Sequence, residues 1–221
     1  MGVRMRLGIH PLPAFNPHTC PLCLKDMSDN PYHALGCGKL KQTVVHARHD
    51  KACALIAEFA RSCDAVATCT TRSDGSKGDT VPDGYIYLRN KSISFDVTGI
   101  NTHFKSYETR EARTNGGALK DREGAKIKTY RQHAADNDLE FIPVVIDLYG
   151  RCGDKAIKLF EDIALELTSI DSYRAPHINM SLTDFMIELS CIWQKFKFNA
   201  RIISQWACKS RQVIYKRNNR R

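Results

Sequence analysis

The spacing of cysteines and histidines between residues 18 and 50 is the feature that most constrains this chain. Two residues separate Cys20 from Cys23, nine separate Cys23 from His33, and three separate His33 from Cys37. Two thiolates spaced in this way grip one side of a tetrahedral Zn²⁺, and an imidazole with a third thiolate closes the other side. Four protein ligands leave no open coordination position, so the spacing predicts a structural zinc site.

Two alternatives stay open for this cluster. His46 or His49 can replace His33 as the fourth ligand, and the cysteines can also be free thiols in a loop. The chain has 9 cysteines, an odd number, and residues 1–15 are interrupted by His10 and Pro11, so they do not form a secretory signal. We therefore expect reduced thiols in the nucleus or cytoplasm and a protein that is not secreted.

Length and composition predict one main globular domain. The 221 residues are 43% hydrophobic and 26% charged, which suffices for a core without disulfides. Mean hydropathy is −0.38, and no apolar run approaches the roughly 20 residues of a membrane-spanning helix, so we expect no membrane insertion. The net charge of +9 comes entirely from the residues after Glu188, which include nine cations and no acid.

The basic C-terminus predicts nucleic-acid binding. Such cations bind phosphate backbones without reading sequence, so we expect DNA, or RNA in its place, as the partner. A nuclear import signal or a solvated terminus are the alternatives. The apolar face that includes Trp193 is expected to pack on the main domain. The tail residues assigned to nucleic-acid binding are Lys209, Arg211, Lys216 and Arg217.

The predicted organisation has four parts. They are an extended arm at 1–17, a zinc-binding module at 18–50, an α/β domain at 51–180, and a C-terminal helix with the basic tail at 181–221. Apolar periodicity predicts a small mixed β-sheet flanked by helices. The expected helices cover 43–63, 118–136, 154–167 and 181–206; the expected strands cover 65–71, 84–88, 93–98 and 141–148. Residues 101–114 fit no single pattern.

Two carboxylates lie on the predicted hairpin of the second and third strands. Asp83 follows Pro82 just before one strand, and Asp96 lies inside the other, so the two side chains can meet and share a divalent ion. Composition alone gives about 0.6 Pro-Asp pairs, so a single pair is unremarkable. The alternative is a turn Asp at 83 with a hydrogen-bonded Asp96. Strand alternation places Asp96 with Ser94 and Thr98, so burial of Asp96 is not required.

The order of these features resembles a known family. The zinc cluster leads into Arg48-His49-Asp50, then a helix, then Pro-Asp and a second Asp within three strands. A lysine-bearing helix containing Tyr130 and the strand at 141–150 follow. This order is similar to the restriction-like endonuclease domain of site-specific non-LTR retrotransposons, a branch of the PD-(D/E)XK fold. The resemblance covers roughly residues 18–170 and rests on the combination of motifs.

The resemblance implies an αβββαβ core and a Mg²⁺- or Mn²⁺-dependent endonuclease that nicks DNA. Whether a homodimer cleaves both strands stays open. Asp83 and Asp96 would hold the metal ion, and Lys126 and Tyr130 would complete the catalytic site. The sequence departs from the usual pattern at Thr98, where a lysine is common. It departs again at Thr129, where this branch has its second lysine.

Two residues near the zinc cluster, Arg48 and His49, are expected to contact nucleic acid. A surface role for Lys126, a core role for Tyr130, and either a ligand or a surface role for Glu58 stay open. Beside the nuclease, two other classes remain. One is a catalytically inactive, zinc-containing nucleic-acid-binding protein derived from such a nuclease, and the other is an adaptor whose zinc module docks a partner.

Overall fold

The chain divides into two compact units, one of Met1–Arg48 with Lys195–Arg221 and one of His49–Gln194. A computed structural model describes residues 19–20, 22–27, 33, 37–40, 45–70, 81–102, 105–168 and 181–194. The predicted arm at 1–17 and the basic tail beyond residue 194 lie outside these residues.

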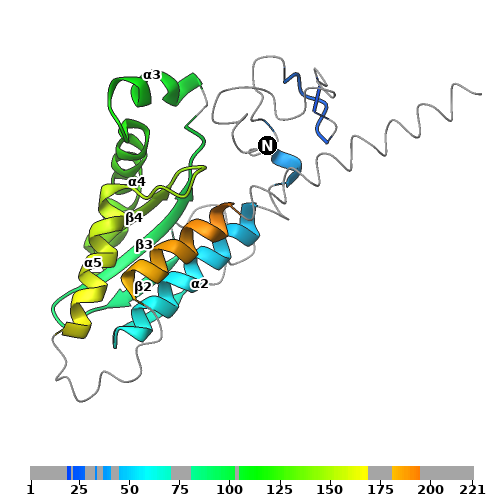
Figure 1. The fold of residues 1–221 in the computed structure, drawn as a ribbon. Helices are drawn as coiled ribbons and strands as arrows, with labels where there is room; N and C mark the ends of the chain where they lie inside the picture. Colours follow the sequence, from blue (N-terminus) through cyan, green and yellow to red (C-terminus); the bar gives the residue numbers. More distant parts are fainter. Residues whose placement is uncertain are drawn as a thin grey trace, which may run out of the picture. The chain divides into compact units, whose positions relative to one another are not determined.

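In the second unit one helix is followed by three strands, two helices, a fourth strand and further helices, close to the order that the apolar periodicity predicts (Figure 1). The segment 101–114, which fits no single pattern, contains a helix. The elements are η2 (Gly38–Leu40), α2 (His46–Ser62), β1 (Val66–Cys69), β2 (Gly84–Tyr87), β3 (Ser92–Gly99), α3 (Lys105–Arg113), α4 (Gly117–Asp136), β4 (Glu140–Ile146) and α5 (Asp154–Thr168). A further helix covers 182–194.

The four strands form one mixed sheet in the order β1-β2-β3-β4. The first three are antiparallel neighbours, and the β2–β3 turn is closed by a bond from the Leu88 amide to the Lys91 carbonyl at 2.9 Å. β4 pairs with β3 in parallel, because the chain crosses over through α3 and α4 before it returns. The predicted α/β class with a small mixed sheet is therefore confirmed.

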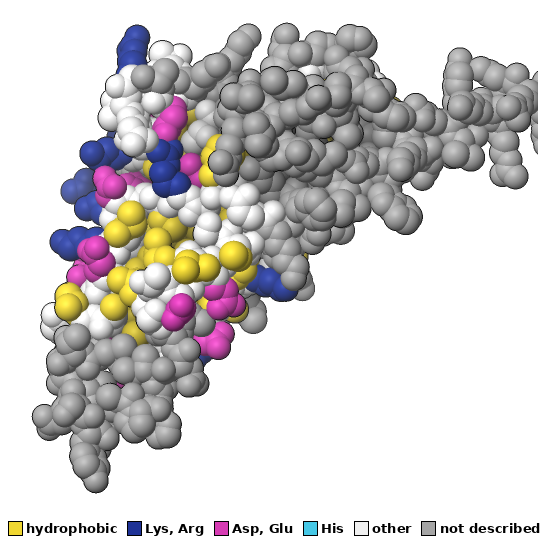
Figure 2. Space-filling view, viewed as in Figure 1, with side chains coloured by type: hydrophobic (Ala, Val, Ile, Leu, Met, Phe, Trp, Pro, Cys, Tyr) yellow, Lys and Arg dark blue, Asp and Glu magenta, His cyan; other side chains and the backbone are white. Residues whose placement is uncertain are grey.

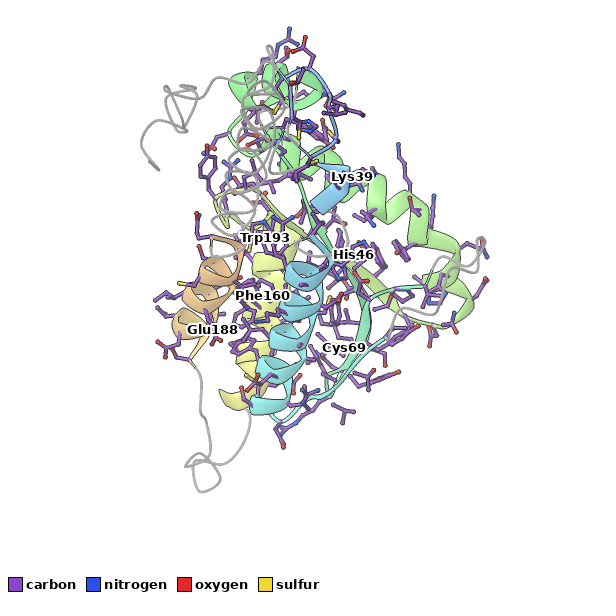
Figure 3. All side chains as sticks on the ribbon, turned by 90° about the vertical axis from the view of Figure 1, so that its right-hand side faces the viewer. Lys39, His46, Cys69, Phe160, Glu188 and Trp193 are labelled. Carbon is purple, nitrogen blue, oxygen red and sulfur yellow. The ribbon has the colours of Figure 1, made fainter. Side chains whose placement is uncertain are left out.

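Helices cover both faces of the sheet (Figure 3). On one face α2, α5 and the 182–194 helix enclose the main core, to which β3 contributes Ile93, Phe95 and Val97. α5 buries Ala156, Leu159, Phe160 and Ile163. Trp193 is 1% exposed and lies in the same core, as expected from the sequence.

The opposite face of the sheet is covered by α3 and α4. Here Val145 and Ile100 pack against Ala118 and Leu119 at the start of α4. The polar positions of β3 point to this side, so α4 lies directly over the face that carries Asp96. None of the described helices combines the length and the apolar character needed to span a membrane.

Candidate functional site

The Cys/His cluster of the first unit is assembled as the spacing predicts. The ligand atoms of Cys20, Cys23, His33 and Cys37 all lie within 4.8 Å of one another. The Cys20 and Cys37 sulfurs are 3.9 Å apart, and the Cys23 sulfur is 3.0 Å from His33 Nε2. A cluster of this kind can hold a metal ion such as zinc.

Cys20 and Cys23 both lie in one tight turn that is closed by backbone hydrogen bonds. The Cys20 amide donates to the Lys25 carbonyl at 2.7 Å, and the Leu24 amide donates to the Cys20 carbonyl at 2.8 Å. Leu24 takes a φ of 63°, the left-handed conformation that closes the turn.

The protonation of these groups also suits a metal site. Burial lowers the pKa of His33, with Lys25 adding to the effect, so the imidazole is neutral and can coordinate. Burial raises the pKa of the Cys37 thiol to about 11, and a bound cation would reverse this by replacing the proton. His33 is thus the histidine that the described residues place with the three thiols.

In the second unit, the sheet fixes the position of Asp83. Its amide donates to the Phe95 carbonyl and its carbonyl accepts from Thr70, both at 2.8 Å, so the backbone is held between β1 and β3. The last paired residues of β2 and β3 are Gly84 and Phe95, and Asp83 and Asp96 are the residues next to that pair, one just before β2 and one inside β3. The hairpin therefore brings both carboxylates to one end of the ladder.

Asp96 is bonded at both carboxylate oxygens. Oδ1 accepts a hydrogen bond from the Tyr130 hydroxyl at 2.6 Å. Oδ2 lies 2.7 Å from Lys126 Nζ and accepts from the Thr98 hydroxyl at 2.9 Å. Because each oxygen has two lone pairs, Oδ1 keeps one acceptor position with respect to the residues that the structure describes.

Strand alternation predicted that Asp96 would not need burial, yet only 5% of the residue is exposed. The face assignment is correct, but that face is not open to solvent. α4 crosses it and covers Asp96 with Lys126 and Tyr130. The cation and the hydroxyl offset the cost of removing the carboxylate from water.

The helical spacing of Lys126 and Tyr130 places both on the face of α4 that meets the sheet. The Tyr130 ring stacks on Phe141 with centroids 4.4 Å apart, and Lys126 Nζ lies 5.4 Å from the Tyr130 centroid. Burial raises the pKa of Tyr130 well above its ordinary value, and the neighbouring Asp96 raises it further. Tyr130 therefore stays a neutral hydrogen-bond donor to Asp96 while its ring is packed in the interior.

Thr98 and Thr129, the two departures from the usual nuclease pattern, each form a hydrogen bond through the side-chain hydroxyl. Thr98 donates to Asp96, at a position where a lysine would reach the same carboxylate. Thr129 is exposed and its hydroxyl donates to the Ala125 carbonyl of its own helix at 3.0 Å. Lys128 and Glu58 are exposed, so Glu58 has the surface role.

His49 is the residue whose place the sequence did not predict. Its Nε2 lies 2.8 Å from Asp83 Oδ2, and its Nδ1 lies 3.0 Å from Asp50 Oδ1. The Cys53 sulfur, one turn along α2, is 3.7 Å from Nδ1. The adjacency of Arg48, His49 and Asp50 to the helix start was visible, but nothing in the sequence paired His49 with a residue 34 positions away.

Of the residues predicted to contact nucleic acid besides His49, the structure describes Arg48 but not the tail cations. Arg48 is buried in the structure, and burial lowers the pKa of its guanidinium to about 10. Its contact with nucleic acid stays a prediction. The four tail cations, Lys209, Arg211, Lys216 and Arg217, lie outside the described residues.

Comparison of the sequence with models of known protein families and with curated proteins finds no match.

Proposed function

We propose that this protein is a metal-dependent endonuclease that hydrolyses one phosphodiester bond of DNA at a time. The observation that supports it most is the ion pair between Lys126 and Asp96 on the polar face of the sheet, with Asp83 held against the neighbouring residues of β3 by hydrogen bonds to the Phe95 carbonyl and from the Val97 amide. Two carboxylates that can hold a divalent ion and a lysine beside one of them form a residue set that can support metal-assisted phosphodiester hydrolysis.

Each side chain has a distinct role in this proposal. Asp83 and Asp96 hold a Mg²⁺ or Mn²⁺ ion, which when bound supplies a Lewis acid and an activated water. The Lys126 ammonium stabilises the negative charge that develops on the phosphate oxygens. Tyr130 orients Asp96 through the 2.6 Å hydrogen bond and excludes water from one side of the carboxylate.

The order of elements supports the same proposal. One helix, three antiparallel strands, two helices and a parallel fourth strand give the αβββαβ succession with one added helix, α3. This is the succession that the resemblance to restriction-like endonucleases implies. Asp83 lies just before β2, Asp96 lies inside β3, and Lys126 lies on the helix that covers Asp96, which is compatible with the proposed roles.

Surface charge favours approach of DNA from the α4 side. α4 carries five Lys and Arg residues against three acids, of which Glu123 is buried and Asp121 is paired with Arg110. The 182–194 helix, on the other side of the sheet, carries Asp184 and Glu188 and no Lys or Arg. Figure 2 shows this second side, with hydrophobic and acidic side chains in its centre and Lys and Arg mainly at its edges. Phosphates would be repelled there and attracted to α4.

For the first unit we propose a structural zinc ion held by Cys20, Cys23, His33 and Cys37. Three thiolates and one imidazole match the ligand preference of zinc, and both Cys20 and Cys37 are almost completely buried. With four protein ligands the ion has no open position for substrate, so it stabilises the fold of its unit and takes no part in hydrolysis.

The experiment measures binding and cleavage separately. We expect zinc-loaded protein to nick supercoiled plasmid with Mg²⁺ or Mn²⁺, and Asp96→Asn to bind DNA as well as wild type while nicking at least 100-fold more slowly. Asp136→Asn, an exposed acid at the end of α4, is the matched control and should nick normally. DNA binding without nicking by wild type, over a range of targets, would favour the catalytically inactive binding protein instead.

A further inference from the structure

We propose that His49 is a ligand of the ion held by Asp83, so that the site binds Mn²⁺ in preference to Mg²⁺. This inference rests on the proposed function and adds the identity of the metal. The sequence position of His49 predicts a contact with nucleic acid or a role as zinc ligand. In the structure its side chain lies instead against Asp83, the first carboxylate of the acidic pair.

The distance between the two side chains suits coordination of one ion. His49 Nε2 and Asp83 Oδ2 are 2.8 Å apart. Nitrogen and oxygen ligands lie about 2.1 Å from a small divalent ion, so neighbouring ligands at a right angle are about 3.0 Å apart. An ion can therefore replace the proton between these atoms with a shift of a few tenths of an ångström.

Asp50 holds the imidazole in the form that coordinates. Its Oδ1 lies 3.0 Å from His49 Nδ1, on the side of the ring away from Asp83. A carboxylate that accepts the Nδ1–H bond leaves the Nε2 lone pair facing the ion and increases its basicity. Both histidine nitrogens are thus accounted for, one by the orienting carboxylate and one by the proposed ion.

The backbone of β3 also holds the Asp83 carboxylate. Asp83 Oδ2 also accepts a hydrogen bond from the Val97 amide at 2.7 Å, which fixes the carboxylate between β3 and α2. Cys53, 5% exposed, packs beside the imidazole, with its sulfur 3.7 Å from His49 Nδ1.

The donor set determines the preferred metal. Mg²⁺ favours oxygen ligands and keeps most of its water, whereas first-row transition ions bind imidazole well. A histidine beside a carboxylate therefore favours Mn²⁺ over Mg²⁺.

The experiment measures metal affinity directly, without reference to cleavage. Full-length, zinc-loaded protein is titrated with Mn²⁺ by electron paramagnetic resonance and with Mg²⁺ by calorimetry. We expect His49→Gln to weaken Mn²⁺ binding at least tenfold and Mg²⁺ binding less than threefold, and Asp50→Asn to weaken Mn²⁺ binding about tenfold. His133→Gln, a histidine whose Nε2 lies 3.5 Å from the Tyr85 hydroxyl, is the control and should change neither.

Asp83→Asn separates failure of this inference from failure of the proposed function. If Asp83→Asn loses Mn²⁺ while His49→Gln and Asp50→Asn bind it as wild type does, His49 is not a ligand and the carboxylate site stands. If wild type binds no Mn²⁺, or if Asp83→Asn retains full affinity, the metal site itself is wrong and both proposals fall. Circular dichroism of each variant shows that a loss is not caused by unfolding.

Discussion

At the scale of single residues, the site depends on how a buried carboxylate is compensated. Asp96 is almost fully removed from water, which is costly for an anion without partners. Lys126, Tyr130 and Thr98 each contribute one bond to it. Loss of the ammonium would leave the charge paired only by hydroxyl groups, so Lys126 is the residue whose removal should affect both fold and chemistry.

Lys126→Gln tests this directly. We expect the nicking rate at saturating DNA to fall by about 10²–10³, because the charge that stabilises the transition state is lost. Unfolding free energy should fall by about 3 kcal/mol, because the buried carboxylate loses its partner. Lys128→Gln, two residues away and exposed, should keep wild-type values of both quantities. A normal single-turnover rate for Lys126→Gln would exclude the lysine from catalysis.

At the scale of elements, the position of Asp83 depends on close packing of three strands at Gly84. A Cβ at this position would lie 2.5 Å from the Thr68 carbonyl oxygen and 2.6 Å from the Phe95 ring. The Thr68 carbonyl and the Phe95 ring therefore lie closer to Gly84 than a residue with a side chain would allow. Asp83 is the adjacent residue, so its position depends on this packing.

Gly84→Ala should force β2 away from its neighbours. We expect a loss of about 1–3 kcal/mol of unfolding free energy, measured by urea denaturation, and a parallel loss of nicking as Asp83 moves. Gly124→Ala is the matched control, since nothing lies within 4 Å of its added Cβ inside α4, and it should stabilise the protein by about 0.5–1 kcal/mol. Equal stability of the two variants would contradict the packing described here.

Between α4 and α5, Glu123 makes stability depend on pH. Its Oε1 accepts from the Lys155 amide at 3.0 Å in the first turn of α5, and burial raises the pKa of the carboxyl above 4.5. The folded state then binds the proton more tightly than the unfolded state, so unfolding free energy falls as pH rises from 4.5 through the folded pKa.

Glu123→Gln should remove the loss of unfolding free energy that Glu123 causes as pH rises. The glutamine amide oxygen still accepts the hydrogen bond from the Lys155 amide but carries no charge. Relative to wild type, the unfolding free energy of Glu123→Gln should therefore be more favourable at pH 7 than at pH 4.5. Glu58→Gln, on the exposed surface of α2, should behave as wild type does. A variant with the wild-type pH dependence would show that Glu123 is not its source.

Periodic elements were predictable, and relations between distant elements were not. The apolar repeats of α5 and the alternation of β3 depend on local sequence, and the cap of the last helix does too: the Ser181 hydroxyl donates to Asp184 Oδ2 and accepts from its amide. The burial of Asp96 and the contact of His49 with Asp83 depend on which helix covers which part of the sheet. That information is spread over the core and appears in no short motif.

At the scale of the whole molecule, the chain combines a Cys/His unit with an α/β unit, and we expect the first to require zinc for its fold. Native mass spectrometry should find one zinc ion per chain in wild type and in Cys69→Ser, an exposed cysteine outside the cluster. Cys37→Ser should lose the ion, because the buried thiolate closes the ligand set. Wild-type zinc content in Cys37→Ser would mean that other residues hold the metal.

The central claim is that Asp83 and Asp96 together support phosphodiester hydrolysis. The most direct test is a time course of plasmid nicking by zinc-loaded wild type and by the double variant Asp83→Ala/Asp96→Ala, with Mn²⁺ present and enzyme in excess. We predict conversion of supercoiled to nicked plasmid by wild type and none above background by the double variant. Nicking at equal rates by both proteins would contradict the account.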